Sequence, residues 1–503
     1  MLVGLFLYKE RERKYKMLSV EEIKKFIEED TLSEKKRKAA EGQRYYEAEH
    51  DILNTRLFYF DADGELKEDK TRSNIKISHP FFMELADQLA SYMLSFKESP
   101  IRAKDSKEAE GLQEELDTYF DDEFWAEISD LITGCYVKGF ENLYAYKNEE
   151  DRTAFECADS MGVVEVQGKY TKDGQDYKIY HYLDTDLSDK EKRQVRRIQV
   201  WTNEDTHFFM QDSESQEIVK DTSVAINPRP HVMYEDGTAG IPYGFIPFWR
   251  LDYNKKQFSG LKAIKSLIDD YDLMECGLSN NLSDFDTPIH VVSGFQGDNL
   301  DELITNLKTK KTIGVDAGGG IQVQTVDIPY QARKVKADED EKNIYRFGFG
   351  FNSSQVGDGN ITNIVIRSRY ALLDLKASKL EKRLKKLLKK IVQIVLDEIN
   401  TVNGTGYTMK HVEIKKFEPS IMTNESENIQ NAMIEAQRKQ VEVTTILNVA
   451  ASVGDDQALK AICDVMDWDY EQLKKAIEEA KAAELDAAKK TLEGIVPEEP
   501  PVE

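Results

Sequence analysis

The chain has 503 residues, of which 40% are hydrophobic and 10% aromatic, so it can form several cores and is not disordered as a whole. Its 68 Lys and Arg residues against 93 Asp and Glu residues give a formal charge of −25. A globally basic nucleic-acid binder is excluded, because phosphate affinity comes from cations. No apolar run approaches the roughly 20 residues of a membrane span, and the N-terminal apolar run is too short for a signal peptide.

Helical patterns dominate the first 140 residues. Residues 1–60 are charged and helical in pattern, and Ser19 and Glu22 have the spacing of a capping box, which predicts a peripheral helical arm. Between residues 78 and 96 apolar side chains recur at helical spacing and predict a core helix. A second core helix is predicted from Asp122 to Gly139.

The hydrophobic period then changes twice. Between residues 143 and 248 the hydrophobic period is about two, and Asp-Gly turn signals separate the strand-like stretches. This pattern predicts a β-rich module of antiparallel hairpins. From Ser259 a helix is predicted, followed by an insert that reads strand, short helix, strand, glycine turn, strand, and by a second helix from Gln331.

The last third is helical in pattern again. A glycine- and asparagine-rich stretch at 347–360 precedes a long helix from about Ile361 to Asn400, about 60 Å long at 1.5 Å per residue. A short strand-like stretch follows. From Thr423 several short helices are predicted, with breaks at Gly454-Asp455 and Asp467-Trp468, and the last residues form an acidic tail of disordered composition.

The stretch IGVDAGGG, Ile313 to Gly320, resembles the phosphate-binding hairpin of the sugar kinase and actin-like family. The simpler interpretation is a glycine turn between two strands. It is favoured because Ile321, rather than a hydroxyl residue, follows the glycines, and because the chain has no GxxxxGK[ST] loop.

The histidines and cysteines give no catalytic or metal-binding pattern. The seven histidines are scattered, no two at metal-ligand spacing, and are interpreted as structural. The four cysteines form no CxxC pair, which favours a reducing compartment, and Cys135 lies in an apolar stretch typical of a buried, inert thiol. No cofactor, metal or catalytic residue is predicted.

The long helix is locally basic. Residues 361–400 hold ten Lys or Arg against four Asp or Glu, and the run Leu380 to Lys390 reads LEKRLKKLLKK. Such a run can contact nucleic acid or a membrane surface. Alternatively, the run is the solvated face of an amphipathic core helix, or it pairs with acidic neighbouring subunits. These two interpretations are favoured over contact with nucleic acid or a membrane.

The order of helix, small α/β insert, returning helix, glycine-rich loop and very long helix resembles the order of stem, clip, stem, tunnel loop and wing helix in phage portal proteins. Local sequences strengthen the resemblance to portals of long-tailed double-stranded DNA bacteriophages of Gram-positive bacteria. They are GQRYYEAEHDIL (42–53), SNIKISHPFFMELADQLASYMLS (73–95), NPRPH (227–231), GFIPFWRLDYN (244–254), LKAIKSLIDDYDLMECGLSNNLSDF (261–285) and RYALLDLKASKLEKRL (369–384).

The resemblance implies an α+β portal fold, mainly helical, with a β-rich portion in the wing. The implied divisions are an N-terminal arm (1–40), wing (41–258), first stem helix (259–284), clip (285–330), second stem helix (331–350), tunnel loop (351–360), long wing helix with return strand (361–422), crown (423–490) and tail (491–503).

The resemblance also implies a function. Portals are ring oligomers, usually of twelve subunits, at one capsid vertex, where terminase drives the genome inward and from which the genome later leaves. The implied partners are double-stranded DNA bound without sequence specificity, terminase, major capsid and scaffolding proteins, and the head-completion adaptor. The protein would assemble in the host bacterial cytoplasm, belong to the virion, and have no catalytic activity, no cofactor and no membrane.

Three groups of site residues follow from matching segments. The implied DNA tunnel loop comprises Asn352, Ser353, Ser354, Gln355, Gly357, Asp358, Gly359 and Asn360, with glycines 348, 350, 357 and 359 giving mobility. The polar clip positions that are candidates for contact with terminase or the adaptor are Asp298, Asp301, Glu302, Lys308, Lys310 and Lys311. The basic face of the wing helix comprises Lys382, Lys385, Lys386 and Lys389.

Two alternatives stay open at this point. One is an actin-like kinase, which rests on IGVDAGGG and predicts nucleotide binding with Mg²⁺. The other is a nucleic-acid-binding scaffold, which rests on the basic helix and predicts salt-sensitive DNA affinity of the monomer. Neither accounts for the order of the implied stem, clip and wing.

Overall fold

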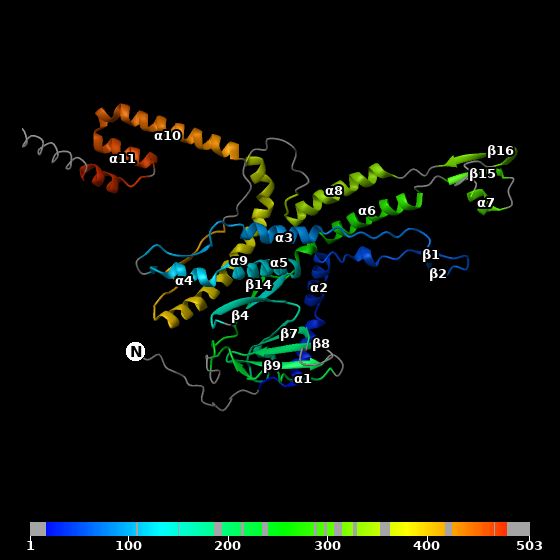
Figure 1. The fold of residues 1–503 in the computed structure, drawn as a ribbon, viewed down its shortest axis with the longest axis horizontal. Helices are drawn as coiled ribbons and strands as arrows, with labels where there is room; N and C mark the ends of the chain where they lie inside the picture. The colour runs from blue at the N-terminus through cyan, green and yellow to red at the C-terminus, as the bar shows by residue number, and fades with distance from the viewer. Residues whose placement is uncertain are drawn as a thin grey trace, which may run out of the picture. The chain divides into compact units, whose positions relative to one another are not determined.

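The computed structural model describes residues 17–106, 109–148, 150–185, 194–212, 216–233, 240–285, 289–295, 299–305, 314–324, 329–352, 363–417, 425–466 and 468–479. The chain divides into two compact units. The first comprises residues 1–357 and 369–420, and the second comprises residues 358–368 and 421–503. Figure 1 shows the described elements with the labels used below.

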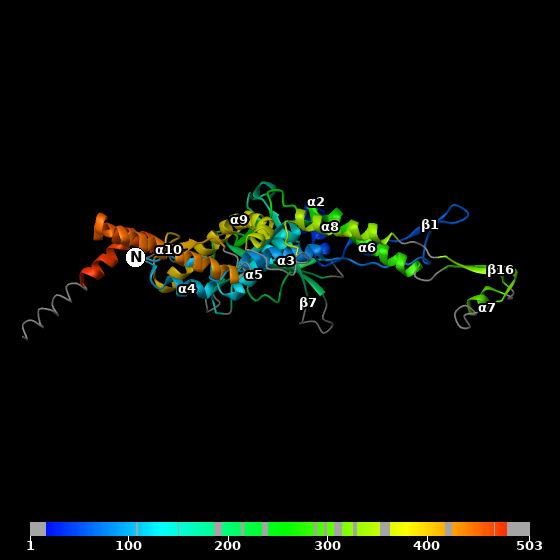
Figure 2. The same ribbon diagram turned by 90° about the horizontal axis from the view of Figure 1, so that it is seen from above.

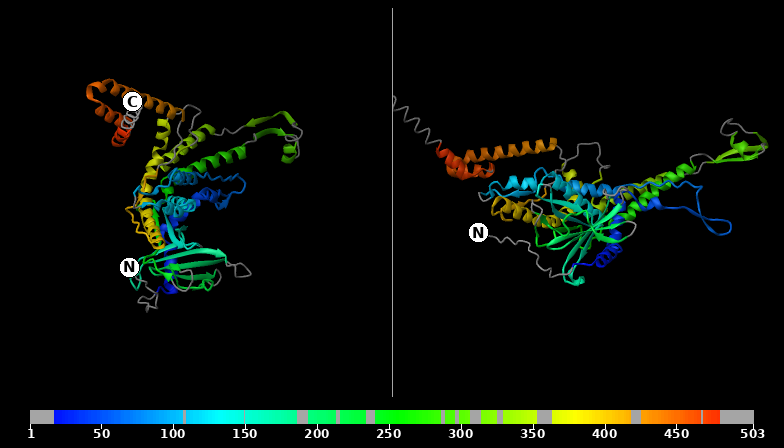
Figure 3. Two further views of the ribbon diagram at one scale, coloured as in Figure 1. Left: turned by 60° about the vertical axis from the view of Figure 1, so that its left-hand side comes forward. Right: turned by 60° about the horizontal axis from the view of Figure 1, so that its bottom comes forward.

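The N-terminal helices are built into the first unit. Helix α1 (Val20–Thr31) begins with the predicted capping box, in which Ser19 accepts from the backbone N–H of Glu22 while the Glu22 carboxylate accepts from that of Ser19. Its Ile23 and Ile27 are buried in the core of a β-sheet that α1 crosses (Figure 3). The predicted helix is therefore present, and its apolar stripe is covered by this sheet.

Helix α2 (Glu34–Tyr46) continues from α1 and buries Ala39 and Tyr45. A 3₁₀ turn, η1 (Asp51–Asn54), leads into a small hairpin of β1 (Phe58–Phe60) and β2 (Leu66–Glu68). The core of the unit then gains helices α3 (Phe81–Leu94), α4 (Leu112–Tyr119) and α5 (Asp122–Lys138). The two predicted core helices, α3 and α5, are thereby confirmed.

The predicted β-rich module is also confirmed, and all its pairings are antiparallel. One sheet has the order β10-β9-β8-β7-β6, with β11 added to β9, and a second has the order β14-β4-β5. The strands are β4 (Phe140–Lys147), β5 (Thr153–Ala158), β6 (Val163–Val166), β7 (Tyr177–Thr185), β8 (Gln194–Trp201), β9 (Asp205–Asp212), β10 (Ile218–Lys220), β11 (Arg229–Pro230) and β14 (Phe248–Asp252). Smaller elements are β12 (Val232–Met233), paired with β13 (Gly240–Ile241), and the 3₁₀ turn η3 (Gly168–Tyr170).

Two helices leave this body side by side, as Figures 1 and 2 both show. Helix α6 (Lys265–Phe285) follows the 3₁₀ turn η4 (Gly260–Ala263), and α8 (Tyr330–Gly348) returns. Between them in sequence lie β15 (Ile289–Phe295), α7 (Leu300–Thr305) and β16 (Val315–Gln324), and the two strands pair with each other beyond the ends of α6 and α8.

Helix α9 (Asn363–Asn403) is 41 residues long, close to the predicted long helix, and Gly404 with φ of 66° follows its end. Its last part buries one apolar stripe in the first unit, and β17 (Val412–Ile414) then pairs with β3 (Ile101–Ala103). The second unit contains α10 (Glu425–Val453) and α11 (Asp455–Met466), with residues 470–479 helical as well. The predicted break at Gly454 is confirmed, and the helix before it, α10, has 29 residues and is longer than predicted.

Candidate functional site

Ion pairs and hydrogen bonds between side chains join α6 to α8. Lys336 of α8 pairs with Asp270 of α6 at 2.5 Å and with Asp340 of its own helix. Arg333 Nη1 donates to the carbonyl oxygen of Met274 at 3.3 Å. A Cβ at Gly277 would lie 2.4 Å from the same Nη1 atom, so a glycine lets the guanidinium lie flat against α6. The two helices therefore behave as one helical hairpin.

An extended segment, residues 73–79, is fixed along α6 by a row of side-chain acceptors. Alternate backbone N–H groups of the segment donate to residues that recur every four positions on the helix. Two extended residues advance about 6.6 Å and four helical residues about 6 Å, so the two repeats stay in register. The pairs are Ser73 with Asp284 (3.1 Å), Ile75 with Asn280 (2.6 Å), Ile77 with Cys276 Sγ (3.1 Å) and His79 with Asp272 (3.0 Å).

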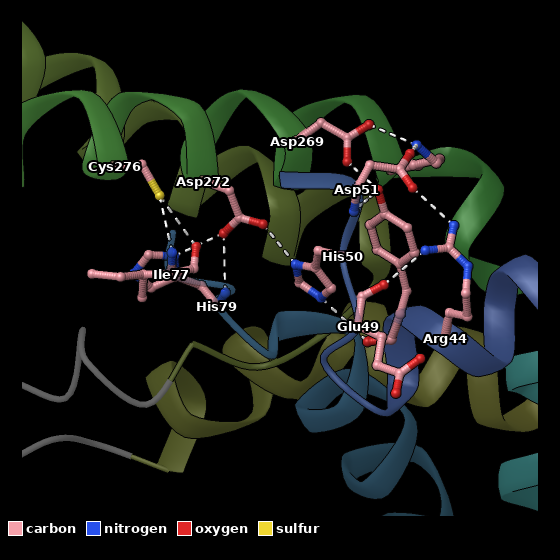
Figure 4. Close-up of polar contacts among 11 residues, drawn as sticks. Arg44, Glu49, His50, Asp51, Ile77, His79, Asp269, Asp272 and Cys276 are labelled. Carbon is pink, nitrogen blue, oxygen red and sulfur yellow. Dashed lines mark hydrogen bonds and ion pairs between the residues drawn. The ribbon is translucent and has the colours of Figure 1, made fainter. Parts of the chain in front are cut away.

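Asp272 is the centre of a buried polar cluster at the base of α6, drawn in Figure 4. One carboxylate oxygen is 2.6 Å from Nδ1 of His50, and the other is 2.7 Å from Nδ1 of His79. Burial acts to raise the pKa of Asp272, but the hydrogen bonds from the two imidazoles outweigh it and hold this pKa below its usual range. Both histidines thus have structural partners, as predicted, although the sequence did not indicate that they share one carboxylate.

The chain after α8 is held against α3 up to the limit of the described residues. Gln88 makes two hydrogen bonds to the backbone of Phe351, at 2.8 and 3.0 Å, and the Phe351 ring stacks on Tyr370 at 4.6 Å. Asn352 is half-buried and donates to Glu341 at 2.9 Å. The other predicted tunnel-loop residues lie outside the described residues: Ser353, Ser354, Gln355, Gly357, Asp358, Gly359 and Asn360.

Two of the four glycines predicted to make this loop mobile have another role. A Cβ at Gly348 would lie 2.6 Å from a methyl group of Leu85, and one at Gly350 would lie 2.0 Å from the other methyl group. The prediction is therefore wrong for these two, because they allow close packing against α3. Phe349, rather than a glycine, takes the left-handed conformation that ends α8, with φ of 56°.

Lys376 of α9 is a buried residue of the candidate site that was not predicted from the sequence. Its side chain is buried at the junction of three helices, where Nζ donates to the carbonyl oxygens of Gly348 at 3.0 Å and Leu85 at 3.4 Å. Nζ also lies 4.4 Å from the centre of the Tyr136 ring. Burial lowers the pKa of Lys376 to about 7. The available signal was its place on the apolar stripe of the long helix, beside Leu373 and Ala377.

The predicted basic face of α9 is present on its solvent side. Lys382, Lys386 and Lys389 are exposed, and none of them forms an ion pair within the described parts of the chain. Lys385 differs, because it is half-buried and pairs with Glu381 at 2.9 Å. The structure therefore places three of the four predicted lysines together on the solvent side of α9, unpaired among the described residues.

The predicted clip residues are described in part. Asp301 lies exposed on α7, and Glu302 lies on the same helix, while Asp298, Lys308, Lys310 and Lys311 lie outside the described residues. The predicted glycine turn is wrong: residues 318–320 belong to one strand, β16, which pairs with β15 across a register shift at Ser293 to Phe295. Gly318 absorbs the irregularity with φ of 94°.

The described side chains include no group of three His, Cys, Asp or Glu placed to hold a metal ion. Among the same residues, every helix is too short or too polar to cross a lipid bilayer. All four cysteines are free thiols, and burial raises the pKa of Cys135 far above its usual range, as expected of an inert buried thiol.

Comparison with known proteins gives a consistent result. The family model described as phage portal protein, SPP1 Gp6-like, matches residues 25–486. A portal protein of Bacillus phage SPP1 is 25% identical over 392 residues, which cover 78% of this chain and 76% of the relative. A portal protein of Clostridium phage phiCD119 is 22% identical over 396 residues, covering 75% of this chain and 82% of the relative. The chain therefore belongs to the SPP1 Gp6-like family of phage portal proteins.

Proposed function

We propose that copies of this chain form a ring at one capsid vertex and that double-stranded DNA passes through its centre during packaging and ejection. The observation that carries the proposal is the coupled α6–α8 hairpin with the β15–β16 pair beyond its ends, followed by α9, in a chain of the portal family. Copies packed side by side would cover apolar side chains that α6 and α8 leave exposed, among them Leu273, Leu282 and Val335.

In this proposal α6 and α8 are the stem, and residues 285–330 are the clip that contacts terminase and later the head-completion adaptor. Residues 351–360 are the tunnel loop, α9 belongs to the wing, and α10 and α11 belong to the crown. The ring would have about twelve copies, meet major capsid and scaffolding proteins, and assemble in the host bacterial cytoplasm. No catalytic group of this chain is needed, because the terminase motor supplies the energy.

The composition of the loop supports its assignment to the channel. Residues 351–360 contain no Lys or Arg and one acid, Asp358. A channel that lets DNA slide needs weak contacts, and amide and hydroxyl side chains can touch phosphates without a strong cationic grip. Gln88, Tyr370 and Lys376 hold the base of the loop, so motion would be confined to the residues beyond Asn352.

Class-averaged electron microscopy of the purified full-length chain tests the ring directly. We expect closed rings with a central channel. A monomer or an open filament at every ionic strength and protein concentration tested would contradict the proposal.

The loop assignment has its own test, in which Gly357 and Gly359 are both replaced by Ala. Ring formation should be unchanged while DNA packaging in a terminase-driven assay falls, because alanine restricts the backbone. Gly406→Ala is the matched control, since a Cβ there meets no atom within 4 Å. Packaging at the wild-type level by the double variant would argue against a mobile loop in the channel.

A further inference from the structure

The exposed side of α9 carries cations that form no ion pair with the residues the structure describes. Helix α9 buries one apolar stripe that includes Leu380, Leu384 and Ile391. Lys382, Lys386 and Lys389 follow one another at intervals of four and three residues on the opposite side, so they form one face. We call these three residues the basic face.

A second face has the opposite charge. Glu123, Glu127 and Asp130 are spaced by four and three residues on α5, and Glu156 lies on β5 next to Cys157, whose N–H donates to Glu127 at 2.7 Å. None of these four carboxylates, which we call the acidic face, forms an ion pair with a described residue. The pKa of Glu127 is raised first by burial and also by the like charges of Asp130, Glu156 and Glu123.

The two faces point in different directions within one protomer. Tyr136 of α5 lies 4.4 Å from Lys376 Nζ and so marks the side of α5 that faces α9. Glu127 precedes Tyr136 by nine residues. At 3.6 residues per turn this is about two and a half turns, so the two side chains lie on opposite sides of the helix. The acidic face of α5 thus turns away from α9, and the basic face of α9 lies opposite the stripe that α9 buries.

We propose that the basic face of one protomer docks on the acidic face of the next protomer in the ring. The proposal rests on the proposed function, because it needs a ring. A closed ring is built from one head-to-tail contact, which uses two different faces of every protomer, and complementary charge fixes their register and disfavours other pairings. The occupant of each face is therefore a second copy of this chain.

Two charge-reversed variants test the contact. Variant one, Lys382→Glu with Lys386→Glu and Lys389→Glu, has two acidic faces. Variant two, Glu123→Lys with Asp130→Lys and Glu156→Lys, has two basic faces, because three lysines then stand against the one remaining carboxylate, and it leaves the Cys157 hydrogen bond of Glu127 intact. By native mass spectrometry of the full chain, we expect each variant alone to need about tenfold more protein for half-assembly than the wild type. An equimolar mixture should restore assembly, with the two variants alternating.

A third variant, Lys24→Glu with Lys255→Glu and Lys410→Glu, controls for net charge, because it changes the charge as much as variant one does at exposed, unpaired lysines. It should assemble like the wild type. Rings of variant one that form at wild-type concentrations but retain less DNA would overturn the inference, leave the portal proposal intact and assign the basic face to DNA. A mixture that fails to assemble while both variants melt at the wild-type temperature would also overturn it. Absence of rings in the wild type would overturn the portal proposal as well.

Discussion

Lys376 places an amino group in the interior, and no described carboxylate forms an ion pair with it. Its Nζ donates to the carbonyl oxygens of Gly348, where α8 ends, and Leu85 of α3, so one side chain ties three helices together. An ammonium group suits the end of a helix, where carbonyl oxygens lack partners and the dipole is negative. The cost is desolvation, which lowers the pKa of the group to about 7.

This pKa predicts a pH-dependent stability. Between pH 7 and about 10, Lys376 is mostly neutral in the folded chain and mostly protonated in the unfolded chain, whose lysine pKa is about 10.4. The unfolded state then binds more protons, so the free energy of unfolding rises with pH in this window. We expect Lys376→Met to remove this rise, which urea unfolding of both proteins at pH 7, 8 and 9 would measure. Parallel pH profiles would contradict the prediction.

Asp272 gives a second prediction at the level of single residues. Asp272→Asn removes the charge that both His50 and His79 contact, so we expect a loss of about 2–3 kcal/mol in the free energy of unfolding at pH 7. The native pKa of this carboxyl lies below its unfolded value, so its stabilising effect is present above pH 4 and is lost as the pH falls through the native pKa. Glu275→Gln is a control on the same helix, since Glu275 is only half-buried, and an equal loss there would show that the cluster has no special part.

Among elements, the joint between α3 and the chain leaving α8 is the tightest contact of the candidate site. Leu85 is fully buried, and its two methyl groups occupy the space that side chains at positions 348 and 350 would need. The glycines and the leucine therefore form one complementary unit, and the loop begins from a fixed base.

This packing predicts a non-additive pair of substitutions. Gly350→Ala should lower the free energy of unfolding by about 1–3 kcal/mol through overpacking, and Leu85→Ala by about 2–5 kcal/mol through a cavity. The double variant should lose less than the sum of the two, because the new methyl group enters the cavity. A double-mutant cycle by urea unfolding measures the coupling, and strict additivity would contradict the proposed fit.

The whole molecule is strongly acidic, and its charge is unevenly distributed. The formal charge is −25 per chain, whereas residues 361–400 carry an excess of six positive charges. In a ring the many acidic copies would produce a field that repels DNA, and the cations of α9 would be attracted to acidic protein surfaces.

This distribution predicts weak, salt-insensitive DNA binding by the assembled protein. A protein that neutralises six or more phosphates loses about 10³-fold or more in affinity between 50 and 200 mM salt. We expect a change below about tenfold for wild-type rings, measured by fluorescence anisotropy with a labelled duplex. A steep salt dependence would instead indicate a cationic DNA site on the ring.

The local elements could be predicted from sequence because their causes are local. The capping box at Ser19, the apolar stripes of α3, α5 and α9, and the alternation in the β-rich module depend on residues a few positions apart. The order of these elements, with the quoted segments, was enough to indicate the family that the comparisons confirm.

Other features were decided by tertiary structure, because they join residues that are far apart in the chain. His50 and Asp272 meet across 222 positions, and Lys376 reaches the end of α8 and the middle of α3 at once. Gly348 and Gly350 suggested flexibility by composition, yet the closeness of Leu85 makes them packing residues. Sequence periodicity shows which side of a helix is buried, but it does not show which distant group lies against that side, and the functional geometry of this protein depends on that choice.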